Sequence, residues 1–328
     1  MTVTKPYHNL DQQIEKLRSR GLIISSENRA KRQLLKTSYY DLINGYKDLF
    51  LEEKRGEYND DKYIEGTNFE DLTKLYHLDR ELRHIVMRVS LDIESNFYTT
   101  LAYCVAEEYG EKEAHYLKEK NYRRGTWQAK GGFERDNLFK RINGRINNAY
   151  EHPMKHYKHQ YKNVPPWILA KHLNFGELIV WYKLSSPRIK NNVVYRFTEL
   201  DPTEKLKEAF VKSMELFNKF RNRAAHGGRI YNFRTNIEIP YKENLHNLFY
   251  IKKKEYNKGV GRSDFSAFLL TRMYLKQNDK SEYIEKIVYL NSALDTYKKE
   301  SPKYYNKVLK ELGLPANYYE RLLGILDI

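Results

Sequence analysis

Residues 68–110 read NFEDLTKLYHLDRELRHIVMRVSLDIESNFYTTLAYCVAEEYG and form the longest periodic stretch of the chain. Apolar side chains recur along it at steps of three or four, which is the spacing of one helix face. They are Leu72, Leu75, Leu78, Leu82, Val86, Val89, Ile93, Phe97, Leu101 and Val105. Asn68 is suited to cap the start, and Gly110 ends the pattern. The stretch predicts one long core helix.

The rest of the chain favours the same fold class, all-α. Only 9 Pro and 16 Gly occur among 328 residues, which is typical of a mostly helical protein. Further helices are predicted at 11–20, 26–37, 135–150, 201–226, 263–275, 281–299 and 304–312, and one more opens at Pro165-Pro166-Trp167 and is interrupted near Phe175-Gly176. A loop is predicted at 52–67 and a short extended piece at 234–239. We expect an N-terminal helical and aromatic segment (1–64), a helical core (65–235) and a C-terminal helical extension (236–328), packed as one compact unit.

Composition narrows the function classes. The chain carries 58 Lys and Arg against 43 Asp and Glu, a formal charge of +15, which favours an anionic partner over a neutral one. A solvated basic surface is the alternative. Cys104 is the single cysteine, so a disulfide framework and a cysteine-based zinc site are excluded. No apolar run approaches a membrane span, and the start has no apolar signal core, so we expect a cytoplasmic protein with no membrane partner.

The positive charge is concentrated in residues 115–163, which hold twelve Lys and Arg against four Asp and Glu. Aromatic residues are interleaved with these cations, a pattern suited to an RNA backbone and its bases. The candidates for RNA contact are Arg123, Arg124, Trp127, Lys130, Lys140, Arg141 and Arg145. The alternative is a solvated helical face whose aromatics anchor it in the core. His152, His156 and His159 lack an acidic or cysteine partner, so no metal and no cofactor is expected.

A second informative stretch, residues 220–232, reads FRNRAAHGGRIYN. Asp201 is the predicted N-cap of the helix that leads to it, with Pro202 in the first turn, and Gly227-Gly228 end that helix. On a helical wheel the apolar stripe contains Leu206, Phe210, Met214, Phe217, Phe220 and Ala224. Asn222 and His226 form an i,i+4 pair roughly opposite this stripe, and Arg221 lies at its edge.

These residue types suit chemistry on a phosphodiester. The helix dipole favours a charged His226, while Arg221 and Arg223 oppose it, which would hold the imidazole near neutrality for acid–base work. Arginine supplies paired donors for phosphate oxygens. RNA supplies its own nucleophile, the 2′-hydroxyl. An Arg-x4-His spacing alone is common in basic proteins, however, and the alternative is an exposed histidine at a frayed helix end.

The wider context resembles the HEPN domains of abortive-infection proteins of the AbiD/AbiF type. The motif runs from Arg221-Asn222 through Ala225-His226 to Arg229-Ile230-Tyr231-Asn232. Other segments match in the same order, over about residues 10–235: Leu34-Leu35 with Tyr39-Tyr40, Gly45-Tyr46 and Phe50; Phe69 through Leu75-Tyr76, Asp79-Arg80, Leu82-Arg83 and Ile93-Glu94; Pro165-Pro166-Trp167 with Phe175-Gly176-Glu177.

The resemblance implies a HEPN-like helical bundle that cleaves RNA without metal and serves as a bacterial anti-phage toxin or toxin–antitoxin effector. Arg221 and His226 would be the catalytic pair with Asn222 between them, and the product a 2′,3′-cyclic phosphate. Two motifs would meet across a homodimer or higher assembly, and a structured non-coding RNA would bind and restrain the protein. Arg223 and Arg229 join the RNA-contact candidates. Gly227-Gly228 departs from the family, which often has a polar residue after the histidine.

Glu94 and Asn232 are expected to support the site. Glu94 would pair with Arg221 or Arg229, or else lie exposed on its helix. Two other functions stay open: an RNA-binding protein that keeps the HEPN scaffold without catalysis, and a helical protein-binding module without nucleic acid. Cleavage of RNA by purified protein in EDTA would exclude the RNA-binding protein without catalysis. Partner binding that does not change with salt concentration would favour the protein-binding module.

Overall fold

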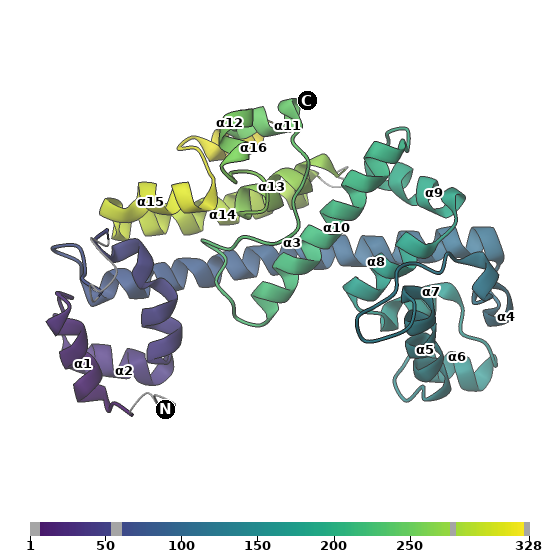
Figure 1. Cartoon of the computed structure of the whole chain (residues 1–328), viewed down its shortest axis with the longest axis horizontal. Coiled ribbons are helices and arrows are strands. Elements are labelled where there is room, and N and C mark those ends of the chain that lie inside the picture. Colours follow the sequence, from purple (N-terminus) through teal and green to yellow (C-terminus); the bar gives the residue numbers. More distant parts are fainter. Residues whose placement is uncertain (1–6, 54–60, 276–279, 325–328) are drawn as a thin grey trace. The chain divides into compact units, whose positions relative to one another are not determined.

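The computed structural model describes residues 7–53, 61–275 and 280–324. Within these ranges every regular element is a helix, and the extended backbone pairs only in isolated bridges, such as Trp127 with Phe133. The predicted all-α class is therefore confirmed (Figure 1). No helix in these ranges combines the length and the apolarity that crossing a bilayer requires.

The helices follow one another with short connections. The N-terminal third contains α1 (Leu10–Ser19), α2 (Glu27–Lys36), η1 (Tyr40–Asn44), η2 (Lys47–Phe50) and α3 (Phe69–Tyr109). The middle contains α4 (Glu113–Tyr116), η3 (Glu119–Asn121), α5 (Glu134–Asn147), α6 (Met154–Gln160), α7 (Pro166–Leu169), η4 (Ala170–His172), α8 (Phe175–Leu184), α9 (Pro187–Thr198) and α10 (Glu204–Ala225). The last third contains α11 (Glu243–His246), η5 (Asn247–Phe249), α12 (Lys253–Asn257), α13 (Phe265–Tyr274), α14 (Lys280–Glu300), α15 (Pro302–Leu312) and α16 (Tyr318–Leu323).

Helix α3 confirms the prediction made from its periodicity. It spans 41 residues, and all ten apolar positions of the predicted face are 4% exposed or less. The start is stabilised by Asp71, whose carboxylate accepts the backbone N–H of Asn68 at 3.0 Å. A carboxylate in the first turn also interacts favourably with the helix dipole.

Three details of the prediction need correction. Helix α10 begins at Glu204, and its N-cap is Thr203, whose hydroxyl accepts the N–H of Leu206 at 3.3 Å; Asp201 lies two residues earlier. The predicted extended piece at 234–239 is irregular backbone. Helix α9 was not predicted, although Ser186 before Pro187 is a standard helix start. Part of the predicted loop at 52–67, residues 54–60, lies outside the described residues.

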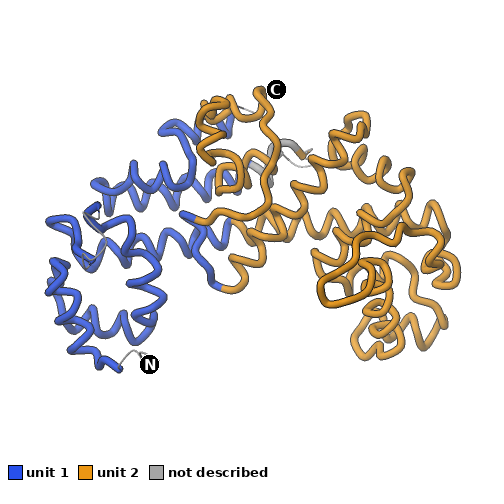
Figure 2. Tube along the Cα trace, in the orientation of Figure 1, with its two compact units in different colours: residues 1–85, 227–232, 284–328 blue, residues 86–226, 233–283 orange. Residues whose placement is uncertain are grey.

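The chain forms two compact units, each assembled from separate stretches (Figure 2). Unit 1 contains residues 1–85, 227–232 and 284–328; unit 2 contains residues 86–226 and 233–283. The proposed division into segments at 64/65 and 235/236 stays a prediction.

Each unit has its own interior. In unit 1 both α3 and η2 contact the C-terminal helical region: Ser301 donates to Asp71 of α3 at 3.1 Å, and Tyr304 meets Phe50 of η2 edge to face. In unit 2, Phe97 of α3 is fully buried, with four aromatic rings around it at centroid distances of 5.9 to 6.1 Å. They are Phe175, Tyr182, Phe197 and Phe210, contributed by α8, α9 and α10. The side chains at the end of α10 therefore project from a firmly packed helix.

Candidate active site

The Arg-x4-His motif lies at the C-terminal end of α10. The last helical residue is Ala225, so His226 is the C-cap rather than part of the last turn; its N–H donates to the carbonyl of Asn222 at 3.1 Å. Gly227 then takes φ +69°, a conformation that glycine adopts without strain. No heavy atom outside its own neighbours lies within 4 Å of the position where a Cβ would be built, so backbone conformation alone calls for glycine here.

The side chains of the motif point as the helical wheel predicts. Phe220 and Ala224 are buried, Arg221 is half-buried, and Asn222 and His226 are exposed. The His226 imidazole makes no hydrogen bond with any residue in the described ranges. Both polar side chains are therefore accessible to a ligand or to a second chain.

Arg221 is held by a carboxylate from another helix. Its Nε lies 3.4 Å from Oε2 of Glu94, which projects from α3. Burial raises the pKa of Glu94, while Arg221 and the backbone N–H of Phe175 act in the opposite direction. The ion pair of Glu94 with Arg221 thus links α3 to the end of α10 within unit 2. Of the alternatives for Glu94, the structure places it against Arg221.

A short polar chain continues from Arg221 along α10. Arg221 Nη1 lies 3.4 Å from Oδ1 of Asn222, and Asn222 Nδ2 donates to Oδ1 of Asn218 at 3.2 Å. The guanidinium and the amide are oriented together, with the guanidinium's charge partly balanced by Glu94. Arg223 takes a different position: it is half-buried, and its guanidinium lies 5.2 Å from the centre of the Phe233 ring.

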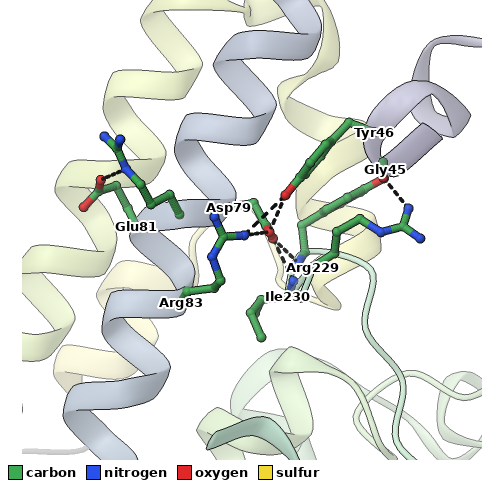
Figure 3. A network of polar contacts seen from close by, with 9 residues as sticks. Gly45, Tyr46, Asp79, Glu81, Arg83, Arg229 and Ile230 are labelled. Atoms are coloured by element: carbon green, nitrogen blue, oxygen red, sulfur yellow. Dashed lines mark hydrogen bonds and ion pairs between the residues drawn. The ribbon is translucent and has the colours of Figure 1, made fainter. Parts of the chain in front are cut away.

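The segment after the motif is anchored within unit 1 by Asp79 (Figure 3). Asp79 is fully buried on α3, and its Oδ1 accepts the backbone N–H groups of Ile230 and Tyr231 at 2.8 and 2.7 Å. Its Oδ2 accepts from Tyr46 at 2.8 Å and from Arg83 at 2.6 Å.

Four donors on two oxygens are the arrangement of an ionised carboxylate. Burial raises the pKa of Asp79, whereas Arg83, the two backbone N–H groups and Tyr46 counteract this. We call this group of residues, Tyr46, Asp79, Arg83, Ile230 and Tyr231, the Asp79 anchor.

The neighbours of the Asp79 anchor fix the same segment. Arg229 donates to the carbonyl of Gly45, and the Tyr231 ring stacks on that of Tyr46 at 5.8 Å. Arg229, an RNA-contact candidate, is therefore half-buried and bonded to Gly45. Asn232 is half-buried, and its side chain has no hydrogen bond within the described ranges.

The Asp79 anchor was missed as a functional feature, although the sequence carries a signal for it. Asp79 falls among Leu75, Leu78 and Leu82 on the apolar face of α3, and Arg83 follows at i+4. A carboxylate on a buried face with a cation one turn later indicates a buried ion pair. Its partners at 230 and 231 lie too far along the chain for periodicity to reveal them.

The basic segment 115–163 divides into free and engaged cations. Arg123, Lys130 and Lys140 are exposed, with no ion pair to described residues. Arg124 lies 4.0 Å from the centre of the Phe133 ring and 3.7 Å from a carboxylate oxygen of Asp136. Trp127 is 65% exposed, with its ring edge-to-face with Phe133 at 5.1 Å.

Arg141 and Arg145 have a structural role. Arg141 Nε donates to Glu177 at 2.9 Å, and Arg145 donates to both carboxylate oxygens at 2.7 and 3.1 Å. Glu177 also forms the capping box that starts α8 with Asn174. Burial acts to raise the pKa of Glu177, but Arg145, Asn174 and Arg141 outweigh it and hold that pKa below its ordinary value. Within the described residues no cluster of three His, Cys, Asp or Glu side chains is arranged to hold a metal ion.

Comparison with known proteins supplies the family. Neither the curated proteins nor the solved structures contain a match to the chain. The family model described as Abi-like protein matches residues 32–232, more than half of the chain. That range contains the Asp79 anchor, Glu94 and the whole motif from Arg221 to Asn232. The chain belongs to the Abi-like protein family.

Proposed function

We propose that this Abi-like protein is a metal-independent endoribonuclease of the HEPN type, acting in the bacterial cytoplasm as an abortive-infection or toxin effector. The observation that carries the proposal is the end of α10, where Arg221 is held by Glu94 while Asn222 and His226 are exposed beside it. Membership of the Abi-like family supports abortive infection as the setting. The HEPN assignment rests on the resemblance of the motif and of the ordered segments before it.

The proposed reaction is an internal transesterification. Neutral His226 takes the proton of the ribose 2′-hydroxyl, and the 2′-oxygen attacks the adjacent phosphorus. The bond from phosphorus to the 5′-oxygen breaks, and that oxygen takes a proton, which leaves a 2′,3′-cyclic phosphate and a 5′-hydroxyl. Arg221 binds the non-bridging oxygens, where negative charge accumulates in the transition state. Asn222 orients the phosphate or the imidazole. The nucleophile belongs to the substrate, so the scheme assigns no step to a metal.

We propose that two chains complete one site. One exposed imidazole acts as base, and the His226 of a second copy protonates the leaving oxygen. The outward orientation of Asn222 and His226 supports such a meeting. Cleavage per chain should then rise with protein concentration over the range in which sedimentation shows dimers forming; cleavage by a persistent monomer would contradict the composite site.

A polyanionic partner is part of the proposal. The formal charge of +15 and the free cations Arg123, Lys130 and Lys140 support RNA as substrate, and a structured non-coding RNA as regulator. Protein purified without nuclease should then carry RNA and absorb maximally near 260 nm. A maximum near 280 nm in low salt would contradict a stable RNA complex.

The catalytic test compares His226→Ala with His159→Ala, which removes an exposed histidine from α6. Both proteins are incubated with a labelled single-stranded RNA in EDTA. Loss of a general acid–base group should slow cleavage by about a hundredfold or more. The His159→Ala protein should cut like the wild type, and a DNA strand of the same sequence should stay intact. Undiminished cleavage by His226→Ala would refute the assignment.

One observation favours the second candidate, an RNA-binding protein without catalysis on the same scaffold. In known catalytic pairs of a nucleophile and a general base, a third group forms a hydrogen bond that orients the general base. The His226 imidazole has no such hydrogen bond within the described residues. On this alternative, Arg221 and His226 bind a phosphate only. Tight RNA binding with no cleavage in either EDTA or Mg²⁺ would establish it.

A further inference from the structure

Unit 2 contains a large cavity at the N-terminal end of α10, away from the Arg-x4-His motif. Its volume is about 1160 Å³, and its wall comes from α9, the first half of α10, the end of α8 and the segment near Tyr241. Basic side chains outnumber acidic ones on this wall by seven to four. Sites for small molecules usually measure about 300–1,000 Å³, so this space is large for a single metabolite.

Lys190 marks the most cationic part of the cavity. It is half-buried, and its side-chain ammonium makes no hydrogen bond or ion pair within the described residues. Burial lowers its pKa, and Arg123, Lys207 and Lys183 lower it further by repulsion. The opposing carboxylate is Glu204, which is itself bonded to Lys207 at 2.6 Å. Lys207 and Lys183 thus have carboxylate partners, whereas Arg123 and Lys190 have no ion pair within the described residues. An incoming anion would relieve the repulsion between these two cations.

A line of lysines leads from the cavity to the motif. Lys205, Lys212 and Lys219 are spaced by seven residues on α10, and His226 follows seven residues later. Seven residues make nearly two turns, so these side chains share one face at steps of about 10 Å. All four are exposed, and the three lysines have no ion pair within the described residues.

The carboxylates on the same face are fewer. Glu208 is exposed there, while Glu215 lies 3.4 Å from Lys183 and is engaged. Lys205 and Lys212 line the cavity, whereas Lys219 lies beyond it toward His226. The helix rise gives a span of about 32 Å from Lys205 to His226. A mononucleotide does not cover this span, but an extended strand with a phosphate at each nucleotide does.

We infer that the cavity and this lysine track, Lys205, Lys212 and Lys219, bind an extended single-stranded RNA and hold the part of the strand remote from His226. Phosphates would contact Arg123 and Lys190 inside the cavity and the lysine track along α10. The inference rests on the proposed function for one point, that the strand continues to His226. The binding surface itself stands on the cavity and its charges.

The test uses a fluorescent 2′-O-methyl oligoribonucleotide of mixed sequence, which keeps the phosphates and blocks the internal nucleophile. Its affinity for the full-length chain is measured by anisotropy at several salt concentrations. One variant combines Arg123→Gln with Lys190→Gln, and a second combines Lys205→Gln with Lys212→Gln. The matched control combines Arg32→Gln with Lys36→Gln, which removes two exposed charges from α2.

Each cavity variant should bind at least tenfold more weakly than the wild type. The slope of log affinity against log salt should fall by about 1.4, which is two phosphate contacts on a single strand. The control should stay within twofold of the wild type. Binding by both cavity variants that equals the control would overturn the inference. Misfolding is not expected to obscure the result, because Lys205 and Lys212 are exposed and Lys190 is repelled by its neighbours.

Two further measurements distinguish a mononucleotide site from a strand site, and failure of this inference from failure of the proposed function. ATP serves as a mononucleotide probe: binding as tight as the strand's, and dependent on Lys190, would make the cavity a nucleotide site and overturn the extended strand. When the cavity is altered, cleavage of a long RNA should show a raised KM. Strand binding that depends on the cavity in a protein that cuts no RNA would refute the proposed function and leave this inference standing. Cleavage with an unchanged KM in both cavity variants would refute this inference and leave the proposed function standing.

Discussion

At the residue scale, the candidate site differs from a chance Arg-x4-His spacing because Arg221 has a fixed partner. An exposed arginine samples many rotamers, and ordering it on a ligand costs about 0.5–1.5 kcal/mol. The ion pair with Glu94 and the contact with Asn222 supply part of that order in advance. His226 has no comparable support, so the two residues of the motif are prepared to different extents.

Glu94→Gln tests whether that order matters. The variant keeps the size of the side chain and removes the charge that faces Arg221, so kcat should fall about tenfold, or about 1.4 kcal/mol. Glu108→Gln is the control, because Glu108 also lies on α3 and pairs with an arginine, Arg188, at 3.2 Å. Thermal unfolding of both proteins is measured alongside RNA cleavage. Equal kcat values for the two variants would show that Glu94 does not position Arg221.

Asp79→Asn tests the anchor of residues 230–231. The amide cannot match a buried guanidinium and two backbone donors, and breaking one side of a buried pair costs about 3–5 kcal/mol. The variant should therefore unfold at a lower urea concentration than the wild type. The backbone amides of Ile230 and Tyr231 should also exchange hydrogen faster. The control is Asp92→Asn, an exposed position on the same helix. Identical exchange in the two variants would contradict the role given to Asp79.

At the element scale, helix ends place the site. The sequence predicts both the buried stripe of α10 and its stop at Gly227-Gly228, because these follow from spacing and from glycine. It misplaces the start by choosing Asp201, although Thr203 suits the N-cap as well, and in the structure the Thr203 hydroxyl accepts the N–H of Leu206. The contacts of Glu94 with Arg221, and of Asp79 with Ile230 and Tyr231, join residues more than a hundred positions apart, which helical periodicity does not encode.

Gly227 tests the helix end, and Gly144, which has the opposite backbone requirement, serves as its comparison. Gly227 has φ +69°, so Gly227→Ala should destabilise the fold by about 1–2 kcal/mol. Gly144 lies inside α5 with open space around its missing Cβ, so Gly144→Ala should stabilise by about 0.5–1 kcal/mol. Chemical unfolding of both variants gives the sign of the change in unfolding free energy. A stabilised Gly227→Ala protein would mean that the helix does not end as described.

The contact between α5 and α8 has a pH signature. The pKa of Glu177 lies below its ordinary value of 4.5, so its ion pairs stabilise the fold fully above that value. As pH falls through the lowered pKa, the carboxylate is protonated and this contribution is lost. The gap in unfolding free energy between wild type and Glu177→Gln should therefore be constant from about pH 7 to 5.5 and shrink below about pH 4.5. A gap that widens on acidification would contradict the assigned ion pairs.

At the scale of the whole molecule, composition indicated an anionic partner but not where it binds. The charge of segment 115–163 predicts RNA contacts at Arg141 and Arg145, and in the fold both arginines hold Glu177. The cavity near Lys190 draws its charge from residues between 123 and 242, so no single stretch reveals it. The two compact units likewise combine distant stretches of the chain. Fold class was therefore predictable from local pattern, whereas the assembly of charge required the three-dimensional structure.

The chemistry of the cut RNA ends distinguishes metal-independent attack by the 2′-hydroxyl from hydrolysis by a metal-bound water. Purified wild-type protein is incubated with a single-stranded RNA in EDTA, beside the His226→Ala variant, and the products are weighed by mass spectrometry. The wild type should leave a 2′,3′-cyclic phosphate and a 5′-hydroxyl, and the variant should leave the RNA intact. Ends bearing a 3′-hydroxyl and a 5′-phosphate, or cleavage that requires an added divalent metal, would contradict it.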